Sequence, residues 1–209
     1  MSEKSYVRGR LLRHLFHIFG AIIPIGYLYI VEDRIYLCKI LIIAFGIALL
    51  LDIIRIFALK REERGLLIKF LSGFMKPGEL WRFSGSTCFI ASSLVVIFYL
   101  PKNIAVASLL FLSFGDPVAT FIGSRIGEER LFWGDKSIEG SLAFFAVSFG
   151  IGIYLLGFVR GLSGALIATV VEALPTHLIF GRFYRWLDDN LTVPLITGFL
   201  IQIVFGFTW

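Results

Sequence analysis

Residues 104–127 read IAVASLLFLSFGDPVATFIGSRIG, an apolar run long enough to cross a bilayer that carries one carboxylate, Asp116. Hydrocarbon does not solvate an ionised group, so such a side chain is paired, hydrated or functional. Gly115 and Pro117 flank Asp116, which predicts a broken or kinked helix whose freed backbone groups line a cavity. The alternative is an Asp that only pairs with a basic neighbour.

The whole chain shares the apolar character of this run. Of its 209 residues, 57% are hydrophobic and 17% are charged, whereas soluble domains are roughly 45–50% apolar. At about 20 residues per helix, the length holds about seven spans and leaves no room for a separate soluble domain. We expect one all-α domain over residues 1–209, a polytopic transmembrane helical bundle.

Charged and turn residues separate the expected spans. These spans cover about 14–31, 35–59, 84–100, 104–124, 138–158, 162–180 and 191–207. Residues 60–83 are basic, are interrupted by Pro77-Gly78 and carry apolar residues at helical spacing. This segment predicts a cytoplasmic helix on the membrane surface, with a structured loop as the alternative.

The basic residues predict the orientation. Of the 20 lysines and arginines, Arg34, Lys39, Lys102 and Arg160 fall on one side, Arg55 lies within a span, and the others gather on the side of the N-terminus. The positive-inside rule then predicts a cytoplasmic N-terminus and an external C-terminus. The net charge of +5 reflects this topology and contact with anionic lipid, so we expect no nucleic-acid partner.

Four further side chains have a structural interpretation. Cys38 and Cys88 lie in apolar runs without metal-ligand spacing, which predicts buried free thiols. Asp52 and Arg55 are three residues apart in one span, and this spacing predicts an ion pair on one helical face near its cytoplasmic end.

The polar residues after Asp116 favour phosphate chemistry. Gly123 and Gly127 alone indicate only a small-residue packing face. Lys136-Ser137-Ile138-Glu139-Gly140 opens the next span, where Ser137 suits the helix N-cap and Lys136 is placed to neutralise a phosphate oxygen. Glu139 is either a first-turn residue favoured by the helix dipole or a metal ligand.

Carboxylates in the last two spans add to this set. Glu172 lies in the middle of the span 162–180 and needs a partner across the bundle. Asp188-Asp189-Asn190 precedes the last span and offers the oxygen ligands that Mg²⁺ prefers, although alone it is an ordinary capped loop. The chain has no GxSxG, HExxH or Walker A motif. The carboxylates, the asparagine, the lysine and the glycines that remain suit metal-assisted transfer of a phosphate group onto a lipid at the cytoplasmic face.

Together these residues resemble the polyprenol kinase family, which includes dolichol kinase, phytol kinase and CTP-dependent diacylglycerol kinase. The matching pieces are Arg13 to His17, Gly115-Asp116 with Ala119, Gly123 and Gly127, Lys136-Ser137 with Glu139-Gly140, and Val171-Glu172-Ala173 with Asp189-Asn190 and Pro194. The resemblance implies a multi-span kinase that uses CTP and a divalent metal, such as Mg²⁺, to phosphorylate a lipid alcohol. The chain is shorter than typical eukaryotic members, so we expect an enzyme of a prokaryotic inner membrane.

The resemblance also implies roles for individual residues. The expected catalytic residues are Asp116, Lys136 and Glu172. The expected nucleotide-binding residues are Gly115, Gly123, Gly127, Lys136, Ser137, Gly140 and Asn190. The expected metal ligands are Asp116, Glu139 and Asp189. In this hypothesis a Gly123–Gly127 loop holds the CTP phosphates, and Asp116 or Glu172 orients or deprotonates the lipid hydroxyl.

Two other functions compete with the kinase. A CTP:phosphatidate cytidylyltransferase, which makes CDP-diacylglycerol, is also multi-span and rich in carboxylates, but it releases pyrophosphate where a kinase releases CDP. A small transporter also contains broken helices and intramembrane carboxylates. The absence of a visible inverted repeat and the gathering of polar residues on one face disfavour the transporter. The acceptor alcohol, whether a polyprenol or a diacylglycerol, and the oligomeric state stay open.

Overall fold

The computed structural model describes residues 18–60, 82–131, 136–174 and 188–206. Helices account for nearly all of this part of the chain, which contains no strand beyond an isolated bridge between Arg130 and Ser137. The helices are α2 (Ile22–Tyr29), α3 (Arg34–Lys60), α5 (Gly85–Tyr99), α6 (Lys102–Ile126), α7 (Ile138–Leu156), α8 (Phe158–Ala173) and α10 (Asp189–Phe205). The all-α prediction is confirmed.

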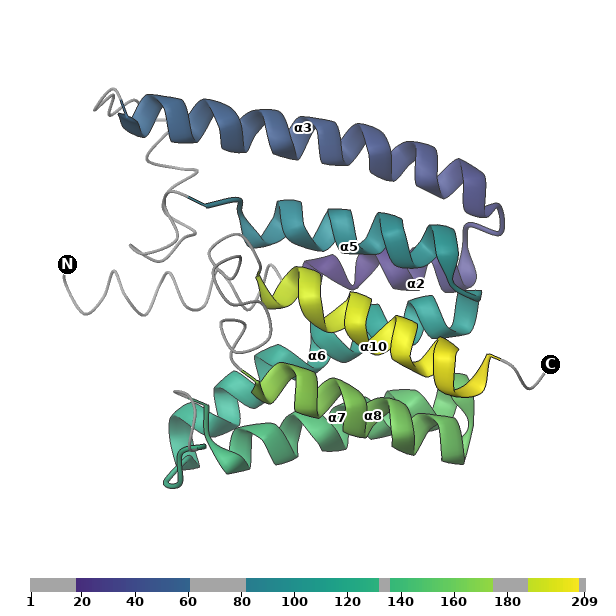
Figure 1. Cartoon of the computed structure of the whole chain (residues 1–209), viewed down its shortest axis with the longest axis vertical. Coiled ribbons are helices and arrows are strands. Elements are labelled where there is room, and N and C mark those ends of the chain that lie inside the picture. The colour runs from purple at the N-terminus through teal and green to yellow at the C-terminus, as the bar shows by residue number, and fades with distance from the viewer. Residues whose placement is uncertain (1–17, 61–81, 132–135, 175–187, 207–209) are drawn as a thin grey trace.

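The helices run back and forth between two ends of the bundle (Figure 1). Helix α6 contacts α2, α5, α7, α8 and α10 and forms the centre, whereas α3 packs mainly on α5 at the edge. Gly157 joins α7 to α8 in a single residue with a φ of +80°, a conformation that suits glycine. Gly152 and Gly161 then let these two helices approach closely, since a Cβ added at Gly152 would lie 2.8 Å from the backbone of Gly161.

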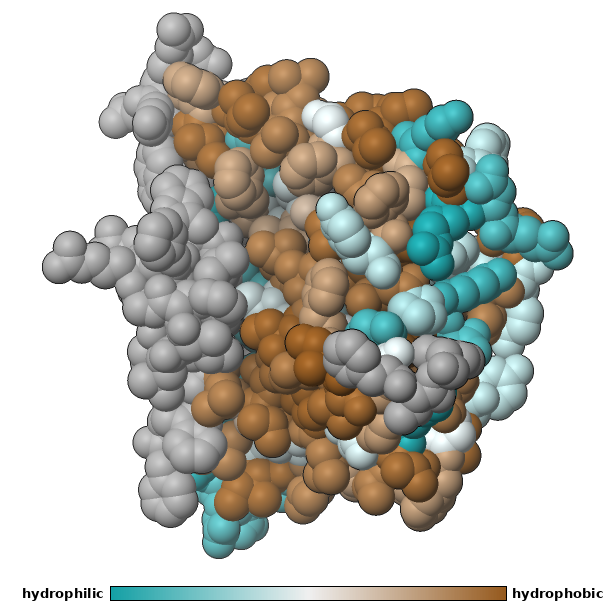
Figure 2. All heavy atoms as spheres, turned by 45° about the vertical axis from the view of Figure 1, so that its right-hand side comes forward, coloured by the Kyte–Doolittle hydropathy of each residue, from teal (hydrophilic) through white to brown (hydrophobic). Residues whose placement is uncertain are grey.

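The membrane character is supported by the lengths and surfaces of the helices. Helices α3, α6 and α7 are long and apolar enough to cross a membrane, and α2, α5 and α10 are shorter but apolar. Hydrophobic residues cover most of the face in Figure 2, while hydrophilic residues gather toward its right-hand side. The chain is a membrane protein, and seven full crossings and the orientation of its termini stay predictions.

Contacts at one end of the bundle involve the basic residues that the sequence placed on the external side. Arg34 donates to the carbonyl oxygens of Phe98 and Leu100, each at 3.2 Å. Lys102 lies 5.1 Å from the ring centroid of Tyr27. These contacts join α3 to the end of α5, and α6 to α2. The opposite end of the bundle contains the start of α7 and the start of α10 (Figure 1).

The two structural predictions within the spans are confirmed. Arg55 Nη2 lies 3.1 Å from Asp52 Oδ1, and both side chains are buried. Asp52 Oδ2 also accepts hydrogen bonds from Ser84 N and Thr87 Oγ1, each at 2.7 Å, so this carboxylate joins α3 to the start of α5. Cys38 and Cys88 are buried free thiols.

Two expectations about α6 are corrected. The helix is not broken at Asp116-Pro117 but continues through Pro117, and the kink that was the other expected form stays a prediction. Gly115 packs against α7 here, since an added Cβ would lie 2.7 Å from the Phe144 ring. The segment 123–127 is not a loop, since it forms the last turn of α6 with Gly127 as the C-cap.

Glu172 also lies elsewhere along its helix than expected. Helix α8 spans Phe158–Ala173, so Glu172 sits in the last turn and not in the middle. The helix ends before Leu174, the residue that precedes Pro175, because proline disfavours helical backbone in the residue before it. The predicted surface helix at 60–83 and the matching segment Arg13 to His17 lie almost entirely outside the described residues.

Candidate functional site

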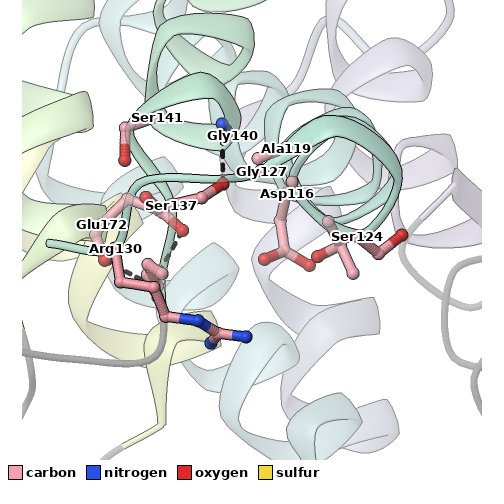
Figure 3. Close-up of a pocket in the computed structure, with 12 residues that line it drawn as sticks. Asp116, Ala119, Ser124, Gly127, Arg130, Ser137, Gly140, Ser141 and Glu172 are labelled. Atoms are coloured by element: carbon pink, nitrogen blue, oxygen red, sulfur yellow. Dashed lines mark hydrogen bonds and ion pairs between the residues drawn. The ribbon is translucent and has the colours of Figure 1, made fainter.

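A cavity of about 250 Å³ lies between the second half of α6, the start of α7 and the last turn of α8 (Figure 3). Asp116, Thr120 and Ser124 are four residues apart, so they share the face of α6 that lines the cavity. Ser137 and Gly140 line it from the start of α7, and Glu172 lines it from α8. The structure therefore brings two of the predicted catalytic carboxylates to one site.

Lys136 ties three segments together at the edge of this cavity. Its Nζ lies 2.8 Å from Glu172 Oε1 and 3.2 Å from Asp189 Oδ2. The same ammonium also donates to the backbone carbonyl oxygen of Glu172. Lys136 immediately precedes Ser137, the N-cap of α7. Its contacts therefore join the start of α7 to the end of α8 and to the start of α10. The prediction that Glu172 meets a partner across the bundle is confirmed.

The acidic surroundings keep Lys136 charged. Burial by itself would lower its pKa, but Asp189, Glu172 and Asp116 more than offset this effect and raise the pKa above the usual range of lysine. The side chain is 34% exposed. Lys136 is therefore a cation at neutral pH, beside the carboxylates of the site.

Glu172 combines burial with one unused hydrogen-bonding atom. Its side chain is 5% exposed, and Oε1 is the atom that faces Lys136. The other oxygen, Oε2, is buried and has no hydrogen-bond partner. Buried polar atoms in native proteins nearly always have a partner, and those without one need an explanation. A hydroxyl group or a cation that enters the cavity would provide it.

Glycines allow the end of α6 to lie against the start of α7. Ser137 caps α7, as predicted, because its Oγ accepts a hydrogen bond from Gly140 N at 3.1 Å. A Cβ added at Gly123 would lie 2.7 Å from Ser137 Oγ, and one at Gly140 would lie 2.9 Å from the carbonyl oxygen of Ala119. Gly127 also lines the cavity. The described contacts give these glycines a packing role, and contact with a nucleotide stays a prediction.

Four predicted site residues do not line the cavity. Asp189 lies 3.2 Å from Lys136 at the edge of the cavity. Gly115 packs against Phe144. Asn190 contacts α5, where its backbone carbonyl oxygen accepts a hydrogen bond from Ser92 Oγ at 2.8 Å. Glu139 Oε1 accepts from the backbone N–H of Glu128 at 3.2 Å. Their nucleotide-binding or metal-binding roles stay predictions, although each residue has a structural partner.

A metal site made by the protein alone is not present in the part of the chain that the structure describes. Among these residues, no three His, Cys, Asp or Glu side chains are grouped closely enough to hold an ion. Proteins commonly bind Mg²⁺ through one or two carboxylates together with water and substrate phosphates. Asp116 and Glu172 are the two carboxylates that line the cavity, so the donor set fits an ion that arrives with a phosphate.

Sequence reasoning did not identify Arg130. This residue lines the cavity and forms the isolated bridge with Ser137. Arg130 belongs to no helix, so no helical periodicity in the sequence points to it. The short spacing between Arg130 and Lys136 was the sequence feature that could have suggested a place for Arg130 in the site. Ser141 and Thr120 were missed for another reason, because hydroxyl groups are common within apolar helices.

Comparison with known proteins identifies the family of the chain. No family model and no solved structure matches the chain. An uncharacterized protein of Rickettsia prowazekii is 30% identical over 187 residues, which is 88% of both chains. Probable phytol kinase 2 of Oryza sativa is 35% identical over 150 residues, 65% of this chain and 47% of that protein. Phytol kinase 1 of Arabidopsis thaliana is 30% identical over 128 residues, 54% and 40% of the two chains.

The similarity reaches bacteria as well as plants. The phytol kinase of a Synechocystis strain is 31% identical over 93 residues, 44% of this chain and 40% of that protein. The chain spans about half the length, or less, of the phytol kinases that it matches. Several of the matched proteins are phytol kinases at about 30% identity. The chain therefore belongs to the polyprenol and phytol kinase family.

Proposed function

We propose that this protein is a lipid kinase that transfers the γ-phosphate of CTP to the hydroxyl group of a membrane lipid alcohol. One observation carries the proposal: Asp116, Lys136 and Glu172 come from separate segments and meet at one cavity in an apolar helical bundle. The matched relatives named phytol kinases support an isoprenoid alcohol as the acceptor. Diacylglycerol is the other acceptor to test.

The cavity suits a chain of phosphates better than a whole nucleotide. Its volume of about 250 Å³ is below the roughly 300–1,000 Å³ of pockets that enclose drug-sized ligands. Ser137 places the N-terminus of α7 at the cavity, where the positive end of the helix dipole favours an anion. We therefore place the phosphates in the cavity, and the nucleoside outside it.

Charge neutralisation and positioning are the main requirements of phosphoryl transfer. Asp116 would hold a Mg²⁺ ion together with water and the phosphate oxygens, and the ion would neutralise the phosphate charge. Lys136 fixes Glu172 through the 2.8 Å ion pair and so sets the position of its free oxygen.

The acceptor hydroxyl requires a proton acceptor. Glu172 Oε2 lacks a hydrogen-bond partner and therefore is able to accept the hydroxyl proton as the oxygen attacks phosphorus. Asp116 faces the same cavity from α6 and orients the alcohol or the phosphate. With the positive-inside prediction, this site lies at the cytoplasmic face of the membrane, where CTP is available.

A labelling experiment tests the proposal. Purified protein is incubated with γ-labelled CTP or ATP and with phytol, geranylgeraniol, a longer polyprenol or diacylglycerol, and in a separate reaction with phosphatidate, and the labelled products are then identified. We expect a labelled lipid and release of CDP. Release of pyrophosphate would indicate a cytidylyltransferase instead, and an unlabelled lipid fraction with every donor and acceptor would contradict the kinase.

A further inference from the structure

The ammonium group of Lys136 has no hydrogen-bond donor left over. An ammonium carries three N–H donors. The side chain and the backbone carbonyl of Glu172 accept two of them, and Asp189 Oδ2 accepts the third at 3.2 Å. A phosphate in the cavity therefore receives no hydrogen bond from Lys136 unless one of these contacts is given up. Direct donation to the phosphate by a basic side chain then has to come from a residue other than Lys136.

Arg130 is the other cationic side chain among the described residues that line the cavity. Two backbone hydrogen bonds fix its position: Leu131 N donates to the Lys136 carbonyl at 2.9 Å, and Ile138 N donates to the Glu129 carbonyl at 3.0 Å. These bonds place Arg130 directly opposite Ser137. Residues opposite each other in an antiparallel pair project their side chains to the same face, so Arg130 shares the cavity side of the bridge with Ser137 (Figure 3).

The other described residues of the lining include no side chain suited to recognise a nucleotide base. The described residues around the cavity are glycine, alanine, serine, threonine and charged residues, without an aromatic ring or a side-chain amide. Bases are recognised by stacking on aromatic or Arg side chains and by hydrogen bonds to their edges. Arg130 is exposed and presents a planar fork of donors, a geometry that matches two phosphate oxygens at once.

We propose that the cavity is a polyphosphate subsite in which Arg130 binds the phosphate chain of the donor directly, while Lys136 only holds Glu172 and Asp189 in place. The inference rests on the proposed function for its choice of donor, but it concerns binding and not transfer. It has a simple consequence. Inorganic tripolyphosphate, which has no base or ribose, binds to the same cavity and competes with the nucleotide.

Isothermal titration of the purified full-length protein with tripolyphosphate and Mg²⁺ tests this inference. We expect binding to wild type, at least tenfold weaker binding to Arg130→Ala, and intermediate binding to Arg130→Lys, because lysine keeps the charge but lacks the fork. The matched control is Arg125→Ala. Arg125 lies 4.2 Å from the ring centroid of Phe121 and does not line the cavity, so its removal should leave binding unchanged.

Three outcomes would overturn the inference: no tripolyphosphate binding to wild type, undiminished binding to Arg130→Ala, or an equal loss in Arg125→Ala, which would reveal non-specific attraction. Unfolding temperatures verify that each variant is folded, and Arg130→Gln replaces Arg130→Ala if that variant does not fold. Binding through Arg130 without phosphorylation of any lipid would contradict the proposed kinase function but uphold the subsite.

Discussion

Lys136 Nζ lies 2.8 Å from Glu172 Oε1, across 36 residues of sequence. The carboxylate side chain is 5% exposed, so its charge has lost most of its hydration. An ion that is buried in this way is destabilising unless a counter-ion and hydrogen bonds compensate it. The pair is therefore part of the framework of the cavity as well as of its chemistry.

Removal of Lys136 should destabilise the fold as well as impair activity. Breaking a fully buried ion pair costs roughly 3–5 kcal/mol, and because Lys136 is 34% exposed we expect about 1–3 kcal/mol for Lys136→Met. The double variant Lys136→Met/Glu172→Gln should recover part of this loss, because no buried charge is then left unpaired. Chemical unfolding in detergent measures the cycle. If the two single losses simply add, the pair does not couple.

The pH dependence of the same pair has a definite sign. The folded-state pKa of Lys136 is raised, so the stability that it contributes is fully present below the unfolded-state pKa of about 10.4 and is lost as pH rises through the higher folded-state value. We expect the difference in Tm between wild type and Lys136→Met to stay constant from about pH 7 to about pH 10. A difference that grows within this window would show that the folded-state pKa of Lys136 is lowered and not raised.

The glycines between α6 and α7 should not tolerate a methyl group. In Gly123→Ala the new Cβ would lie 2.7 Å from Ser137 Oγ, so the helix end and the cap of α7 must separate. We expect a loss of about 1–3 kcal/mol, typical of overpacking, together with a large loss of activity. The control is Gly150→Ala on α7, where an added Cβ meets nothing within 4 Å. Equal effects of the two substitutions would contradict the close approach at Gly123.

The buried pair of α3 should affect stability and not catalysis. Asp52→Asn leaves the buried Arg55 without its carboxylate, which we expect to cost about 3–5 kcal/mol. The exposed Glu32→Gln should change stability by less than about 0.5 kcal/mol. Below its unfolding temperature, Asp52→Asn should retain the KM of wild type. A changed KM would connect this pair to the cavity.

Local sequence patterns predicted much of the fold. The seven apolar runs overlap the seven described helices, because hydrophobic length and charged boundaries are local properties. The cap at Ser137 and the pair of Asp52 with Arg55 were predictable for the same reason, since each depends on residues three apart.

Tertiary contacts explain what the sequence did not predict. Lys136 finds its partners 36 and 53 residues away, and no local pattern encodes that distance. The Gly115-Asp116-Pro117 pattern allowed a break or a kink, but α6 continues through Pro117, and Gly115 packs against Phe144 of α7. The same contact assigns Gly115 a packing role, and the bridge to Ser137 brings Arg130 to the cavity.

Transfer of label from γ-labelled CTP to a lipid alcohol, compared between wild type and Asp116→Asn, tests the central claim most directly. Asp116 lines the cavity and its replacement keeps the shape of the side chain, so we expect about a 100- to 1,000-fold lower rate of lipid labelling with an unchanged unfolding temperature. Ser124→Ala, two turns further along the same face, should retain most of the activity. A labelled lipid produced at the wild-type rate by Asp116→Asn would contradict the assignment of this cavity as the site of phosphate transfer.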